Sequence, residues 1–155
     1  TTTGVEVNGK YSPLSWLSIN GDFNLNYFTR NGDFEMTSFD FKGNRWSTRV
    51  TSKFKLPEEF DLEISGDYRS KYLTVQGQVS ENIFADFGLR KKVFKGKIIL
   101  NLSIRDVFAS RISETITSQP EFYTFNSRQR GRFVSFGISY GFGKGEAMEF
   151  SGRRR

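Results

Sequence analysis

The sequence contains neither cysteine nor histidine. This excludes disulfides, thiol chemistry, zinc sites built from these residues, and catalytic triads that need an imidazole base. The chain also lacks any run of about eighteen apolar residues, so a transmembrane helix is excluded. A transmembrane strand is not, because it needs only about ten residues, half of them polar. We predict that the chain is not an enzyme and has no cofactor and no metal site.

Positively charged residues are only slightly in excess over negatively charged ones. There are 23 Lys and Arg against 17 Asp and Glu, a net charge of +6. Half of that excess lies in Arg153-Arg154-Arg155, and charges of both signs are interspersed elsewhere. No recognition fold or basic helix accompanies them, so we predict no binding to nucleic acid.

Aromatic residues are abundant, with 17 Phe, and they recur in segments that alternate apolar and polar positions. In "WLSINGDFNLNYFTR", residues 16–30, every second residue falls on the same face of an extended chain, which is typical of a strand with one apolar and one polar face. Similar segments are 4–11, 43–56, 60–72, 83–92, 98–105 and 132–142. They predict an all-β fold, an antiparallel amphipathic meander of about seven to eight strands that forms a transmembrane β-barrel or part of one.

The connections between these segments alternate in length. Short turns near residues 13, 58 and 95 alternate with long loops near 33, 76 and 115. Short turns at one rim and long loops at the other are typical of a transmembrane barrel. Phe39 and Phe41 are out of phase with Trp46, so we predict a bulge or the start of the strand near Gly43.

Two observations bear on which solvent meets the apolar face. Aromatic residues gather near the strand ends, and the eleven steps from Trp16 to Tyr27, at ~3.4 Å per residue and ~40° of tilt, span roughly 28 Å, close to the ~25 Å apolar band of a barrel. The favoured interpretation has lipid outside and a charged lumen. Two alternatives stay open. One is a small stand-alone outer-membrane barrel with a structural or adhesion role, and the other is a soluble lipocalin-like binding protein.

Residues 1–142 form the predicted barrel strands, and residues 143–155 a polar basic tail. If the short turns are periplasmic, seven strands place the two chain ends at opposite rims. A complete bacterial barrel has an even number of strands. We therefore expect these strands to be the C-terminal part of a larger barrel.

The last alternating segment, "RFVSFGISYGF", looks like the outer-membrane β-signal that the barrel-assembly machinery reads. The residues that carry this likeness are Phe136, Gly137, Ile138, Tyr140 and Phe142. The sequence departs from the usual pattern in one respect, because thirteen residues follow Phe142.

The likeness extends over most of residues 40–145. The segments "YRSKYLTVQGQ" (68–78), "DFGLRKKVFKGKIILNLSIRDVF" (86–108) and "RGRFVSFGISYGFGKG" (130–145) resemble the C-terminal barrel segment of TonB-dependent outer-membrane receptors, in the branch known as an outer-membrane β-barrel family. The resemblance implies the outer membrane of a Gram-negative bacterium and import of a nutrient such as a siderophore, cofactor, peptide or glycan. Its implied partners are the lipid bilayer, the assembly machinery, the plug and upstream strands of the receptor, and TonB through them.

Four charged residues lie on the predicted polar face, namely Arg45, Arg49, Asp67 and Arg69. If that face lines a lumen, these side chains point into it. We predict that they contact the plug or the solute.

Overall fold

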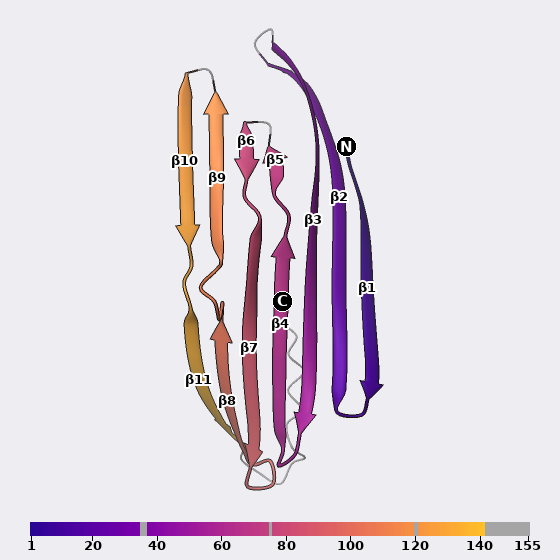
Figure 1. Cartoon of the computed structure of the whole chain (residues 1–155), viewed down its shortest axis with the longest axis vertical. Helices are drawn as coiled ribbons and strands as arrows, with labels where there is room; N and C mark the ends of the chain where they lie inside the picture. The colour runs from indigo at the N-terminus through magenta and orange to yellow at the C-terminus, as the bar shows by residue number, and fades with distance from the viewer. Residues whose placement is uncertain (35–36, 75, 120, 142–155) are drawn as a thin grey trace.

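The computed structural model describes residues 1–34, 37–74, 76–119 and 121–141. Within these residues the fold is all-β, and none forms a helix of the length and apolar character needed to cross a membrane. The strands are β1 (Thr2–Leu14), β2 (Leu17–Phe34), β3 (Thr37–Leu56), β4 (Phe60–Arg69), β5 (Tyr72–Thr74), β6 (Gly77–Val79), β7 (Asn82–Val93), β8 (Ile98–Arg105), β9 (Ile112–Gln119), β10 (Phe122–Gln129) and β11 (Phe133–Tyr140) (Figure 1).

The strands form two antiparallel sheets that lie end to end. The larger sheet has the order β1-β2-β3-β4-β7-β8-β11, and the smaller has the order β10-β9-β6-β5. Each strand of the smaller sheet continues a strand of the larger one, as Figure 1 shows for β4 and β5 or β8 and β9. The described chain thus runs along the long axis seven times, which agrees with the predicted meander. The larger sheet is open, with β1 and β11 at its edges.

The three short turns lie where the sequence predicts them. Leu56 pairs with Phe60 around a three-residue turn. Glu58 and Glu59 in this turn have φ of 59° and 61°, and the turn after β7 likewise places Phe94 and Lys95 at positive φ. These left-handed conformations let the chain reverse within a few residues.

The predicted long loops are wrong, because strands replace most of each. β2 and β3 stay paired up to Phe34 and Thr37, β5 and β6 form a hairpin near residue 76, and β9 and β10 form another near residue 120. Asn31-Gly32-Asp33 reads as a turn, yet these residues pair with Asp40, Phe39 and Ser38. Backbone pairing requires no apolar side chain, so polar segments beyond the apolar band extend the ladder without a hydrophobic pattern that reveals it.

The predicted bulge or strand start near Gly43 is also wrong, because β3 begins at Thr37. The register between β2 and β3 is unbroken from Phe34↔Thr37 to Leu17↔Phe54. Phe41 therefore lies on the polar face, where its ring centroid is 5.6 Å from that of Phe28. Gly43 pairs with Phe28, and a Cβ at Gly43 would come within 2.7 Å of the Phe28 ring. The glycine makes room for that ring and does not mark an irregularity in the strand.

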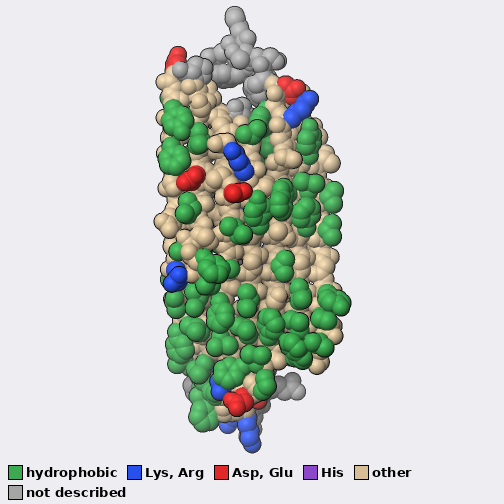
Figure 2. Space-filling view, viewed as in Figure 1, with side chains coloured by type: hydrophobic (Ala, Val, Ile, Leu, Met, Phe, Trp, Pro, Cys, Tyr) green, Lys and Arg blue, Asp and Glu red, His purple; other side chains and the backbone are tan. Residues whose placement is uncertain are grey.

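Register keeps the apolar positions of all seven strands of the larger sheet on one face. Across the sheet Ile64 pairs with Phe87, Phe87 with Ile104, and Ile104 with Val134. Hydrophobic side chains cover much of the face seen in Figure 2, and charged ones are few on it. A polar group on the apolar face is satisfied locally, since the Thr48 hydroxyl donates to the Asp22 carbonyl at 3.0 Å.

Aromatic side chains pair across strands near both ends of the apolar face. Toward the end of the apolar face away from the short turns, the Trp46 ring lies 6.0 Å from the Phe23 ring and 4.6 Å from the Tyr68 ring. Toward the short turns, the Trp16 ring lies 6.3 Å from Phe54. Rings at these two levels match the aromatic girdles that flank the apolar band of a membrane barrel.

The opposite face is polar and contains most of the buried residues. Among the described residues, Phe84 is the buried hydrophobic side chain, whereas Asp67, Ser70 and Asp106 are buried polar ones. Large apolar side chains such as Phe136, at 66%, stay exposed. A water-soluble protein buries the reverse set, so the polar side is the interior of this sheet; we call it the interior face.

An arginine on the apolar face should destabilise the protein. Ile64 lies at mid-strand on that face and is 43% exposed. We expect Ile64→Arg to lower the free energy of unfolding from bilayers by about 2–4 kcal/mol, because hydrocarbon solvates the charge poorly. Urea titration followed by tryptophan fluorescence measures this, with Ser65→Arg on the interior face as the control. Equal losses in both variants would contradict the assignment of the faces.

Candidate functional site on the interior face

The interior face owes its chemistry to alternation within each strand. The polar positions of β3, β4 and β7 stand beside one another because the strands pair without a slip. Arg49 pairs with Asp67, Lys53 with Glu63, and Lys55 with Asp61. Cross-strand neighbours on one face lie about 5 Å apart, so opposite charges meet in rows.

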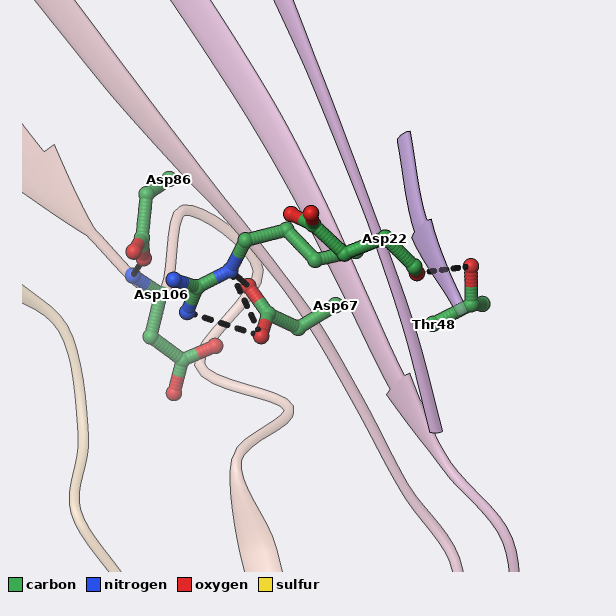
Figure 3. Close-up of polar contacts among 6 residues, drawn as sticks. Asp22, Thr48, Asp67, Asp86 and Asp106 are labelled. Atoms are coloured by element: carbon green, nitrogen blue, oxygen red, sulfur yellow. Dashed lines mark hydrogen bonds and ion pairs between the residues drawn. The ribbon is translucent and has the colours of Figure 1, made fainter. Parts of the chain in front are cut away.

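The shortest of these contacts joins Arg49 and Asp67. Arg49 Nη2 lies 2.8 Å from Asp67 Oδ1, and Nε donates to both carboxylate oxygens at 3.0 Å (Figure 3). The Asp67 side chain is 7% exposed and that of Arg49 is 51% exposed. Asp22 is the other cross-strand neighbour of Arg49. Arg49 is therefore surrounded by carboxylates and its charge is compensated within the sheet.

Asp106 organises the turn that leads from β8 to β9. Its carboxylate is 2% exposed in the folded chain and accepts hydrogen bonds from the backbone N–H groups of Ser110 at 2.8 Å and Arg111 at 3.0 Å. The Asp106 N–H donates to Asp86 Oδ1 at 2.8 Å (Figure 3). The carboxylate fixes the position of Arg111, whose guanidinium carbon lies 4.4 Å from the centre of the Phe84 ring.

A cavity of about 420 Å³ opens on the interior face where the larger sheet meets the smaller one. Five arginines line it, and we call them the arginine cluster: Arg45, Arg69, Arg111, Arg128 and Arg130. The rest of the lining consists of Val79 and of residues with hydroxyl or amide groups, namely Ser47, Ser70, Ser80, Ser113, Tyr72 and Asn82. No acidic residue is among the described residues that line it.

The four predicted site residues divide into two groups. Arg45 and Arg69 both line the cavity, and the guanidinium carbon of Arg45 lies 5.4 Å from the centre of the Tyr72 ring. Arg49 and Asp67 are engaged with each other. Contact of these four residues with a plug or a solute stays a prediction.

Sequence reasoning missed Arg111, Arg128 and Arg130 because it placed no strand between residue 105 and the last predicted strand, residues 132–142. A pattern was present, since Tyr123 and Phe125 alternate with Thr124, Asn126 and Arg128. The position of Arg111 could not be predicted from alternation along a strand, because it depends on the turn that Asp106 holds.

The residues of the predicted β-signal lie on the edge strand β11. Phe136, Ile138 and Tyr140 are exposed on the apolar face and pair with Leu102, Leu100 and Ile98. Gly137 pairs with Asn101, toward the interior. Phe142 and the predicted tail, residues 143–155, lie outside the described residues.

The carboxylates of the described residues lie apart from one another on the sheet. In residues 1–34, 37–74, 76–119 and 121–141, no group of three or more acidic side chains is placed to hold a metal ion. The carboxylates of the interior face are instead used by neighbouring cations and backbone amides, as with Asp67 and Asp106.

These features together define one wall of a transmembrane β-barrel: antiparallel strands, an apolar outer face, a charged interior and tight turns at one end. Comparison with known protein families matches residues 1–140 to the outer membrane protein beta-barrel family. The chain belongs to this family, and it resides in the outer membrane of a Gram-negative bacterium. This location removes the soluble lipocalin-like alternative. Searches among curated proteins and among solved structures found no match.

The pair formed by Arg49 and Asp67 should show energetic coupling. Arg49→Met leaves a nearly buried carboxylate without its cation. A fully buried pair loses about 3–5 kcal/mol when one partner is removed, and half-exposure of Arg49 reduces this to about 1–2 kcal/mol. A double-mutant cycle with Asp67→Asn, followed by urea unfolding from bilayers, measures the coupling. The exposed pair of Lys53 and Glu63 is the control and should couple more weakly; additive effects at Arg49 and Asp67 would contradict the prediction.

Proposed function

We propose that this chain is part of a TonB-dependent receptor that imports a nutrient across the outer membrane, such as a siderophore, cofactor, peptide or glycan. The observation that carries the proposal is the charged, cavity-bearing interior face. A barrel with a purely structural role needs a filled interior, whereas a transporter needs polar groups that face a solute. The resemblance of residues 68–78, 86–108 and 130–145 to such receptors adds support.

The open sheet supports the same proposal. In hydrocarbon each unpaired backbone N–H or C=O group costs several kcal/mol, so lipid-exposed strand edges do not persist. β1 and β11 are the edges of the larger sheet. We propose that further strands of the same receptor pair with them and close a wide barrel around a plug, and that the assembly machinery reads β11 during insertion.

The interior residues have different roles in this proposal. Arg45 and Arg69 line the cavity and contact the solute. Arg49 and Asp67 hold neighbouring strands together and present the exposed half of the Arg49 side chain to the plug. The chain performs no catalysis in this account, and TonB acts on it through the plug.

The proposal is tested by measuring which solutes cells remove from a defined medium. We expect one solute to persist in the medium both when the gene for this protein is deleted and when TonB is absent. Restoring the gene should restore uptake, and restoring it with Arg69→Gln should restore less. Mass spectrometry of the spent medium gives the readout.

The stand-alone barrel predicts a different result from the same strains. Loss of a structural barrel weakens the envelope, so the deletion strain would become sensitive to detergents and large antibiotics while its solute consumption stayed normal. That outcome, independent of TonB, would overturn the import proposal.

A further inference from the structure

We infer that the arginine cluster binds a small solute that carries two or more phosphate or carboxylate groups. The inference names the class of solute for the cavity and so rests on the proposed import function. It begins from the five guanidinium groups that β3, β4, β10 and the residues next to β9 and β10 bring to one cavity of about 420 Å³. That volume is in the range of sites for small molecules.

The cluster lacks compensating charge in the described structure. None of its five arginines forms an ion pair with a carboxylate of the described residues. Three acidic residues of the described structure have other partners: Asp67 is paired with Arg49, Asp86 accepts from the Asp106 N–H, and Asp106 accepts from two backbone amides. The cavity therefore has a positive potential, which the low-dielectric walls of a barrel focus further.

Two of the guanidinium groups are held in place by rings. Arg45 lies over Tyr72 at 5.4 Å, and Arg111 lies over Phe84 at 4.4 Å. Phe84 is 3% exposed and gives Arg111 a rigid support. Stacking fixes the plane of a guanidinium group and leaves its N–H edge available, which suits forked contacts to phosphate or carboxylate oxygens.

The remaining lining suits a solute that is also hydroxylated. Asn82 Nδ2 donates to the Ile112 carbonyl at 2.7 Å, while the buried Asn82 Oδ1 accepts no hydrogen bond from the described residues. The hydroxyls of Ser47, Ser70, Ser80 and Ser113 add further polar groups to the lining. A sugar phosphate has both kinds of group.

The inference is tested by calorimetry on the full-length protein in a neutral detergent. The probe is fructose 1,6-bisphosphate, and fructose is its uncharged counterpart. We expect the bisphosphate to bind at low ionic strength and fructose not to bind. Binding should weaken as salt is added, because the contacts are ionic. Absence of bisphosphate binding would overturn the inference, including the case in which an acidic protein segment already fills the cluster.

Matched variants locate the binding site. Arg69→Gln with Arg128→Gln removes two exposed cations of the cluster, and Lys10→Gln with Lys55→Gln removes two cations at the opposite end of the interior face. We expect the Kd for the bisphosphate to rise about a hundredfold in the first double variant, about tenfold for each lost charge-assisted contact, and to change little in the second. Heat-modifiable migration on gels verifies that both variants fold. Equal weakening in both would mean non-specific attraction and would overturn the inference.

Two further experiments distinguish a free solute from a lipid headgroup as the ligand, and distinguish failure of this inference from failure of the import proposal. Adding lipopolysaccharide to the micelles should leave binding unchanged, since the cluster lies inside; if it abolishes binding, a lipid headgroup is the ligand and the inference fails. Binding in micelles does not require TonB. Bisphosphate binding without TonB-dependent consumption in cells would remove the import proposal alone, and the reverse result would remove the anion site alone.

Discussion

The structure depends on one constraint, which is that every second residue of each strand faces the same side and that pairing preserves this phase across seven strands. A slip of one residue would exchange the two faces of a strand. The register from β1 to β11, which shifts in the β1–β2 pair between Tyr11 and Leu14 beside the turn, therefore maintains the apolar face and the charged interior together. In hydrocarbon this constraint is stringent, because each misplaced charge is penalised and each backbone group needs a partner.

The same constraint creates the site. Because alternation brings Arg49 beside Asp67 and Lys53 beside Glu63, much of the interior charge is compensated between neighbouring strands. The charge balance differs where the larger sheet gives way to the smaller one. There the arginine cluster lines a cavity that has no acidic residue among its described lining residues. The interior thus has a neutralised layer that stabilises the wall and a cationic layer available to a ligand.

Most of the fold could be predicted from the sequence where burial in lipid imposes a pattern. Strands with one apolar face, such as β4 and β8, occur where the alternation places them. Prediction failed beyond the apolar band, in β5 and β6 because three residues are too few to show a period, and in β9 and β10 because the alternation of apolar and polar residues is weak. It failed at Gly43 for another reason, since two interior rings, Phe28 and Phe41, interrupt the polar phase. The site was accessible in part: Arg45 and Arg69 follow from phase alone, whereas Arg111 depends on hydrogen bonds to the buried Asp106.

The contact between hydrocarbon and the apolar face is the central claim, and site-directed spin labelling of β4 in bilayers tests it most directly. Nitroxides placed singly from Asp61 to Tyr68 report collisions with oxygen, which concentrates in lipid, and with a nickel chelate, which stays in water. The account predicts a period of two, with Leu62, Ile64 and Tyr68 reached by oxygen and Glu63 and Ser65 reached by nickel. An inverted phase, or no alternation in a particle that needs no detergent, would contradict it.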